Sequence, residues 1–485
     1  MRRYGLPIVL SATLAFGALA GCTATSQVSS ADSANTANTT SSIVASTANL
    51  ETNESSSSSA SADALPSNSD AASSTSSASS TSSASTGSLP DLTDQFSDRD
   101  LEQTADTTSA KSITVADGED VSITEEGIYV ISGTAKNCTI TVNADETAKV
   151  QLVLDGLSIT NETKPAIFVT SADKVFVTTT DGSTNTLTVT GELAAIGDEK
   201  VTGAIHSKDD ITFNGKGTLV VNSSANGIVG KDDVKFTGGT YQITAGNHAI
   251  KGNDSVRIAD GAFELKATKD AIHADNSDDP ALGYVYVKGG TFTMDAGSDG
   301  IEGDAFVVVD GGTMSIKGAE GIEGTTVKIN DGEISIEASD DGINATSKST
   351  AYSVLLEING GKLTVNMGSG DTDALDSNGD LIVNGGTVDI TAQFAFDFNG
   401  QGQLNGGTVT VNGEQVTEIA NSMQMGGGKG GQGQRGERPD MGDMSGQAPQ
   451  GGFGGHGHGP HGNMSSQSSD ASSTGTLGSE GSTQA

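Results

Sequence analysis

A two-residue step, a small residue followed by Ile or Leu, recurs through the middle of this chain at a nearly constant spacing. Most successive copies lie 21 to 23 residues apart, and the two longer gaps contain insertions at 276–284 and 346–354. Self-similarity at a fixed period indicates a repeat architecture, in which each unit packs mainly on its neighbours. The copies are Ala204-Ile205, Gly227-Ile228, Ala249-Ile250, Ala271-Ile272, Gly300-Ile301, Gly321-Ile322, Gly342-Ile343 and Ala374-Leu375.

Inside each repeat, apolar and polar residues alternate and then stop at Gly, Asn or Asp, as in the run Val285-Tyr286-Val287 before Gly289-Gly290. β-Branched residues in period two, bounded by turn formers, predict short strands and tight corners. A propeller blade needs about 40 residues, roughly twice this repeat. We therefore predict an all-β fold over 111–420, a right-handed, single-stranded parallel β-helix, which is a solenoid of stacked coils.

The first 22 residues combine two arginines, a short apolar run and the ending Leu19-Ala20-Gly21-Cys22. The apolar run is short for a bilayer span and is typical of a secretory signal. The ending resembles a bacterial lipobox, which implies cleavage before Cys22 and lipid attachment to its sulfur. We expect a lipid-anchored protein on the extracellular face of a bacterial membrane, held there only by its acyl chains.

Low-complexity segments flank the predicted solenoid. Residues 23–110 are rich in Ser, Ala and Thr, and residues 421–485 in Gly, Gln, Ser and His, so we interpret them as a disordered stalk and a disordered tail. The net charge of −37 argues against nucleic acid and anionic lipid headgroups as direct partners and favours cations. We expect a monomer.

Acidic residues flank the small–Ile step in consecutive repeats. Equivalent positions of stacked coils lie about 4.8 Å apart, where two like charges repel by about 1 kcal/mol in water and about 3.5 kcal/mol at an effective dielectric of 20. We expect both acidic columns on the outside of the bend, as a solvated acidic face or as oxygen ligands for Ca²⁺. The predicted calcium ligands are Asp270, Asp299, Glu302, Glu320, Glu323, Asp341, Asp373 and Asp376, with His273 and Asn344 in the second column.

Several segments resemble a known family. The stretch KVQLVLDGLSITNETKPAIFVTSADKVFVTTTDGSTNTLTV at 149–189, the following GAIHSKDDITFNGKGTLVV and the DGIE coils are similar to bacterial carbohydrate-binding-domain proteins. These are secreted, polysaccharide-binding parallel β-helices related in shape to pectate lyases. The resemblance covers about residues 112–412. It implies calcium ions along the coils and affinity for acidic or neutral glycans.

The composition bears on which glycan is bound and whether it is cleaved. The chain has no Trp, so a uronate polymer whose carboxylates complete the shell of a bound Ca²⁺ suits it better than ring stacking. Tyr284 and Tyr352, at the ends of the insertions, are candidate glycan contacts. A lyase needs a base beside the metal, and the repeat region has one arginine, Arg257, with Lys251 nearby. We predict a non-catalytic binder, with a calcium-dependent lyase or an adhesin or structural surface protein as alternatives.

Overall fold

The computed structural model describes residues 87–369 and 372–422, all within one compact unit, Ser82–Ala485. These residues form 32 strands, one short helix, α1 (Asp98–Leu101), and one 3-10 turn, η1 (Thr107–Ser109). The prediction of an all-β fold is therefore confirmed. The predicted signal segment 1–22 with Cys22, residues 23–86 and the tail beyond 422 lie outside the described residues. Among those described, no helix has the length and apolarity required to cross a membrane.

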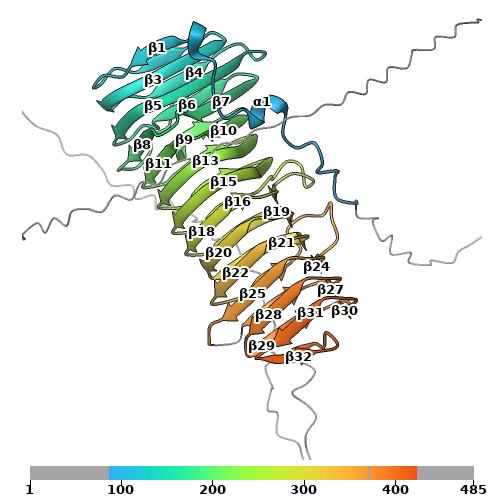
Figure 1. Cartoon of the computed structure of the whole chain (residues 1–485). Helices are drawn as coiled ribbons and strands as arrows, with labels where there is room; N and C mark the ends of the chain where they lie inside the picture. The colour runs from blue at the N-terminus through green and yellow to red at the C-terminus, as the bar shows by residue number, and fades with distance from the viewer. Residues whose placement is uncertain (1–86, 370–371, 423–485) are drawn as a thin grey trace, which may run out of the picture. The chain divides into compact units, whose positions relative to one another are not determined.

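The strands pair in three parallel ladders, each joining equivalent strands of successive coils (Figure 1). The first ladder carries the small–Ile steps, with Ile228 beside Ile250 and Ile301 beside Ile322. It consists of β2 (Val121–Ile123), β4 (Ile140–Asn143), β6 (Ile167–Ser171), β9 (Gly203–Ser207), β12 (Asn226–Gly230), β14 (Ile250–Gly252), β16 (Ile272–Ala274), β19 (Asp299–Val309), β21 (Glu320–Ile329), β23 (Ile343–Ala345), β26 (Asp373–Ser377) and β29 (Phe394–Phe398).

The second ladder follows the first along the chain, and the long strands β19 and β21 pass from one ladder into the other. Its remaining members are β1 (Lys111–Thr114), β3 (Gly127–Lys136), β5 (Lys149–Asn161), β7 (Lys174–Thr179), β10 (Ile211–Gly215), β13 (Asp233–Ala245), β15 (Ser255–Ala267), β17 (Tyr284–Val287), β24 (Leu355–Ile358), β27 (Asp380–Val383) and β30 (Gly402–Leu404).

The third ladder takes the C-terminal parts of β3, β5, β13 and β15. At its end β32 (Glu414–Val416) turns back and pairs antiparallel with β31. The other members are β8 (Thr184–Val189), β11 (Thr218–Ser223), β18 (Thr291–Ala296), β20 (Thr313–Gly318), β22 (Glu333–Ala338), β25 (Lys362–Met367), β28 (Thr387–Thr391) and β31 (Thr408–Val411).

The inward side chains of the three ladders form one continuous apolar core. Stacked coils place like residues together: the Phe213 and Phe236 rings lie 4.9 Å apart, and those of Phe263 and Phe292 lie 4.7 Å apart. Burial of each such side chain contributes about 1.5–3 kcal/mol. The small residue of the repeat is required by close approach, because a Cβ added to Gly321 would lie 2.4 Å from the Gly342 carbonyl oxygen.

The structure corrects the stalk interpretation for residues 87–110. Leu89, Leu92 and Phe96 pack on a second apolar cluster on the outer face of the second ladder, and Asp100 is 1% exposed. Ser97 caps α1, accepting from the Asp100 backbone amide through its side chain. The segment is therefore held on the second ladder by three apolar residues and by the buried ion pair between Asp100 and Lys174, although its overall composition predicts disorder.

Candidate metal centre

The strand register stacks the acidic residues of successive coils into two columns. Asp299 pairs with Glu320, and Glu302 pairs with Glu323, across β19 and β21. The second column consists of His273, Glu302, Glu323, Asn344, Asp376 and Asp397. The first column, two places before the Ile or Leu of each step, consists of His248, Asp270, Asp299, Glu320, Asp341 and Asp373.

The two columns converge, so that one residue of the second column faces the space between two of the first. In three such groups the potential ligand atoms all lie within 4.8 Å of one another. The groups therefore share members and run continuously along four coils. They are His248–Asp270–His273, Asp270–Asp299–Glu302 and Asp299–Glu320–Glu323.

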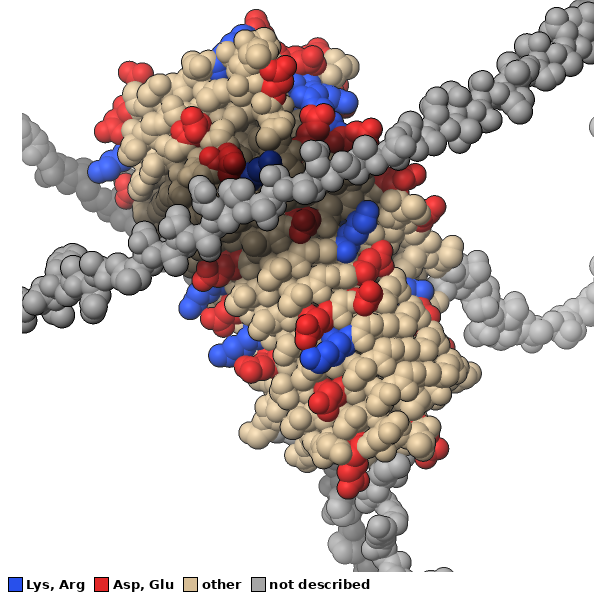
Figure 2. Space-filling model, in the orientation of Figure 1, with Lys and Arg blue, Asp and Glu red and all other residues tan. Residues whose placement is uncertain are grey.

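The carboxylates are buried, which differs from the solvated face that the sequence left open as an alternative. Asp270, Asp299, Glu302 and Glu323 are 3–8% exposed. Lys348, from the insertion after β23, forms ion pairs with both Glu302 and Glu323. Figure 2 likewise shows scattered charged side chains on one face of the molecule, without a continuous acidic stripe on that face. A solvated acidic face therefore does not describe these four residues.

Histidines neutralise the N-terminal end of the columns. Nδ1 of His273 lies 2.8 Å from Asp270 and 2.6 Å from Glu302, and Nδ1 of His248 lies 2.9 Å from Asp270. Burial disfavours the charged imidazole, but hydrogen bonds to Asp270, Asp275 and Glu302 raise the pKa of His273 to about 11. Burial opposes ionisation of Asp270 as well, yet its hydrogen bonds from both histidines hold its pKa far below the usual range.

Further along the columns the pKa values of the acids are raised instead of lowered. Burial, followed by the neighbouring carboxylates, raises the pKa of Asp299 to about 8 and that of Glu320 to about 9. Burial and adjacent acids also raise the pKa values of Asp341 and Asp376 to about 7. At neutral pH these four groups are therefore either protonated or ionised beside a cation.

The donor set in this part of the columns fits a hard cation. Oε2 of Glu320 and Oδ1 of Asn344 are buried and have no hydrogen-bond partner among the described residues. A buried carboxylate oxygen without a partner is costly, and Ca²⁺ takes six to eight such oxygens in flexible geometry. Asp299, Glu320 and Glu323 could hold such an ion. The His248–Asp270–His273 group already contains its own cation.

Several residues in or beside the columns escaped the sequence analysis. Lys348 lies in a recognised insertion, but nothing in the sequence indicates that its side chain reaches Glu302 and Glu323. Asp275 contacts Nε2 of His273 at 3.5 Å and Nζ of Lys251 at 2.7 Å. Asp397 was detectable, because the step Ala395-Phe396 follows Ala374-Leu375 at the repeat spacing of 21 with an aromatic in place of Leu.

Comparisons with known proteins identify the family. The model of the family "carbohydrate-binding domain-containing protein" matches residues 117–374 and 318–435. The chain belongs to this family. A carbohydrate-binding domain-containing protein of Acetivibrio thermocellus is 39% identical over 129 residues, 26% of this chain and 45% of the relative. This chain thus spans less than half the length of that curated relative.

One solved structure is similar in sequence. It is the polysaccharide lyase-like protein from C. thermocellum, as a gadolinium derivative, with 30% identity and a TM-score of 0.39. The similarity covers 52% of this chain and 99% of that one. The resemblance to carbohydrate-binding-domain proteins found in the sequence is confirmed by the family match.

The two tyrosines predicted to contact glycan are not exposed in this family member. Tyr284 and Tyr352 are 7% and 9% exposed and belong to the second apolar cluster. The Tyr284 ring stacks on Phe306 at 4.5 Å, and the Tyr352 ring meets Phe306 edge-on at 5.3 Å. Both rings pack in this cluster because the insertions fold back on the second ladder together with residues 89–96. That they contact glycan stays a prediction.

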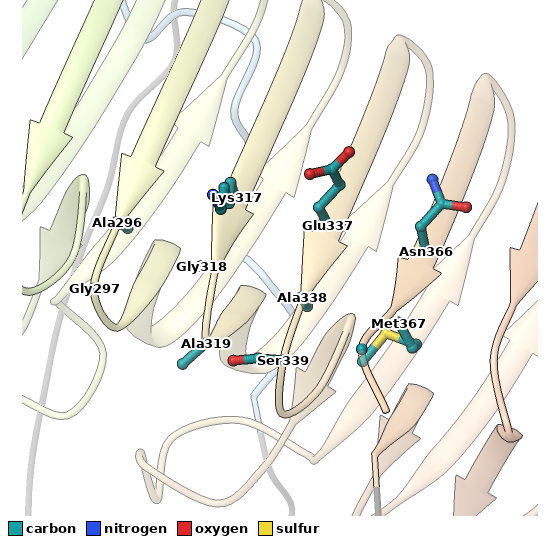
Figure 3. A pocket seen from close by; sticks show the side chains of 11 residues that line it. Ala296, Gly297, Lys317, Gly318, Ala319, Glu337, Ala338, Ser339, Asn366 and Met367 are labelled. Atoms are coloured by element: carbon teal, nitrogen blue, oxygen red, sulfur yellow. The ribbon is translucent and has the colours of Figure 1, made fainter. Parts of the chain in front are cut away.

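A shallow groove instead lies beside the first acidic column. It has a volume of about 500 Å³ and crosses the C-terminal ends of β18, β20, β22 and β25, where Gly and Ala form its floor (Figure 3). Lys317, Glu337 and Asn366 project from successive strands at its edge. The chain passes directly from this groove into the column, since Ala319 precedes Glu320. A bound chain lying here would run across the coils next to the carboxylates.

Proposed function

We propose that this protein binds polysaccharide without cleaving it, at a surface supported by Ca²⁺ in the acidic columns. The observation that carries the proposal is the convergence of buried carboxylates from both columns at Asp299, Glu320 and Glu323, with a partnerless oxygen on Glu320. Membership of the carbohydrate-binding domain family supplies the class of ligand. The in-register ladders support a right-handed parallel β-helix as the scaffold.

A uronate-containing glycan suits this arrangement best. Ca²⁺ takes six to eight oxygen ligands, so an ion held by Asp299, Glu320 and Glu323 would accept oxygens from outside, and a uronate carboxylate is such a ligand. The groove beside the first column offers Lys317, Glu337 and Asn366 for hydrogen bonds to sugar hydroxyls. We place the glycan in this groove, in contact with calcium held by the adjoining column.

The cations near the columns favour binding over lyase chemistry. A lyase base must lose its proton near the working pH. Lys348 is the cation nearest Glu302 and Glu323, and although burial lowers its pKa, those two carboxylates raise it well above the ordinary value. Lys251 is paired with Asp275, and Arg257 with Asp233 on the second ladder. A calcium-dependent lyase and an adhesin or structural surface protein are the alternatives.

The setting we propose is the surface of a bacterial cell. Lipid attached to Cys22 would hold a monomer at the extracellular face of the membrane, with the segment before residue 87 as a tether. This proposal rests on the lipobox in the sequence. Labelling with a radioactive or clickable fatty acid, lost in Cys22→Ser, tests it.

Affinity gels of polygalacturonate and cellulose, run with Ca²⁺ or with chelator, test the function. We expect calcium-dependent retardation on polygalacturonate and no rise in absorbance from unsaturated products. Glu320→Gln should abolish the calcium dependence, whereas the matched control Glu333→Gln, an exposed residue paired with Lys362, should leave it unchanged. Unsaturated products would establish the lyase, and failure to bind any glycan would contradict the proposal.

A further inference from the structure

A second cavity lies on another face of the molecule, between residues 94–100 and the second ladder. Its volume is about 600 Å³, within the range of about 300–1,000 Å³ that small-molecule sites occupy. Its wall on the second ladder consists of residues of β5, β7, β13 and β15 together with Asp173 and Asp210, and these strands precede the coils that carry most of the acidic columns.

Basic side chains from several coils converge on this cavity. Lys149 and Lys174 are register neighbours on β5 and β7, and Lys235 and Arg257 are register neighbours on β13 and β15. In a chain of net charge −37 such a gathering of cations is unusual. Arg257 is also the one arginine of the 111–420 region. Five acidic residues also line the cavity, so its formal charge is balanced. The preference for an anion is local, at the register neighbours Lys235 and Arg257, because like charges on adjacent strands repel.

The chain itself shows how a carboxylate is held here. Asp100 enters the cavity from α1 and lies 2.7 Å from Nζ of Lys174, and it accepts a hydrogen bond from the Thr212 hydroxyl at 2.9 Å. Burial disfavours its ionisation, but hydrogen bonds from Lys174 and Ser97 outweigh that cost and lower the pKa of Asp100 to about 2. One cation of the cavity is therefore already neutralised by a fixed carboxylate.

Lys235 has no comparable partner. Its side chain is buried, and the nearest acidic oxygen is on Asp233, 3.6 Å from Nζ. That carboxylate is engaged elsewhere: it forms an ion pair with Arg257 and accepts a hydrogen bond from Ser255 at 2.6 Å. Burial, together with repulsion from Arg257 and Lys174, lowers the pKa of Lys235.

Asp94, Asp98, Asp173 and Asp210 also line the cavity, but in the described part of the chain none of them forms an ion pair with Lys235. Asp173 is paired with Lys149 at 3.4 Å. A buried ammonium that lacks a close anion is costly, so a ligand carboxylate at Lys235 would complete the set of pairs.

We propose that this cavity binds a carboxylate-bearing sugar, with its carboxylate on Lys235, independently of calcium. The choice of a sugar acid rests on the proposed polysaccharide binding, whereas the position and the charge of the site do not. The site differs from the acidic columns in sign: it takes the ligand carboxylate directly on a lysine, without a bridging cation.

Titration calorimetry of the full chain in chelator tests the proposal with trigalacturonate as the probe and the neutral trisaccharide galactotriose as its reference. We expect trigalacturonate to bind with the metal removed, and galactotriose to bind at least tenfold more weakly. Lys235→Met should weaken trigalacturonate binding at least tenfold. Lys266→Met is the matched control, because Lys266 is exposed on β15 and loosely paired with Asp295 at 3.5 Å.

Lys235→Arg guards against a folding defect, since it keeps the charge and should retain binding within a few-fold. Equal binding of the two trisaccharides in chelator, or unaltered trigalacturonate binding by Lys235→Met, would overturn the inference. Loss of calcium-dependent retention on polygalacturonate gels with calcium-free trigalacturonate binding intact would instead contradict only the proposed function.

Discussion

The two ends of the acidic columns share one backbone register but manage their charge differently. At the N-terminal end, Asp270 contacts both His248 and His273. The neighbouring carboxylates keep His273 cationic. At the C-terminal end, the charges that act on Asp376 are those of the acids Asp341, Asp397 and Asp373. Lys348, between Glu302 and Glu323, marks the transition.

This difference indicates what each end requires from solution. A buried acid paired with a cationic side chain of the protein needs no ion from solution. Removing either partner leaves the other buried without a counter-charge. A buried acid surrounded by acids depends on protons or on metal ions, and its neutral form is favoured until one of them binds. The same repeat therefore supplies a structural ion-pair network at one end and a candidate calcium site at the other.

The largest expected change in the free energy of unfolding is at the N-terminal end of the columns, where Asp270 faces the histidines. Asp270→Asn removes the carboxylate that faces both His248 and His273 and leaves a buried cation without its main partner. Breaking a buried pair in this way costs about 3–5 kcal/mol. Urea denaturation in chelator measures it, with the exposed Asp278→Asn as the control, for which we expect a change below about 0.5 kcal/mol. A loss as small as the control's would show that His273 is not charged.

Calcium should act through the other end. A ligand that binds only the native state stabilises it by about 2.7 kcal/mol at a hundredfold excess over Kd. We expect Ca²⁺ to raise the melting temperature of the wild type and of Asp270→Asn alike, and to have little effect on Glu320→Gln. Mg²⁺ should do less, because it demands tighter octahedral geometry. A melting curve unchanged by chelator, measured by circular dichroism, would remove calcium from the proposed function.

The sequence predicted the columns because the step between them is fixed by packing. Residue 321 must be small because it meets the Gly342 carbonyl, and residue 322 must be apolar. The flanking acids are therefore held in the same register from coil to coil. The burial of those acids was unpredictable for a different reason. It depends on Lys348 and on an insertion whose course is set by contacts such as that from the Tyr352 hydroxyl to the Ala281 carbonyl. Such contacts between insertions leave no periodic signal.

The pH dependence of stability is a third test of the difference between the two ends of the columns. The pKa values of Asp299, Glu320, Asp341 and Asp376 are raised to between about 7 and about 9, against about 4 in the unfolded chain. Between pH 5 and 6 the folded state therefore binds more protons than the unfolded state, and stability falls as the pH rises. His273 stays protonated in the folded state, whereas an unfolded His begins to lose its proton toward pH 6, so this residue adds a small decrease of the same sign.

In chelator we expect a decrease on the order of 1.4 kcal/mol per pH unit for each group that stays fully protonated when folded. Urea midpoints at pH 5.0, 5.5 and 6.0 measure this slope. Saturating Ca²⁺ should flatten it, because the ion replaces the protons. A stability that rises with pH across the same window would show that these acids are ionised in the metal-free protein.

The smallest effect has the opposite sign from the first. Asp376→Asn removes a charge that faces only other acids of the two columns, Asp341, Asp373 and Asp397. Relief of one such repulsion is worth about 1 kcal/mol near water and more where the site is drier. We expect this variant to be more stable than the wild type in chelator at pH 8, and to lose that advantage when Ca²⁺ is added. Since the same Asp-to-Asn change at residue 270 destabilises in chelator, the pair of variants measures the comparison directly. If both substitutions destabilised in chelator, residue 376 would have a built-in partner and the two ends of the columns would not differ.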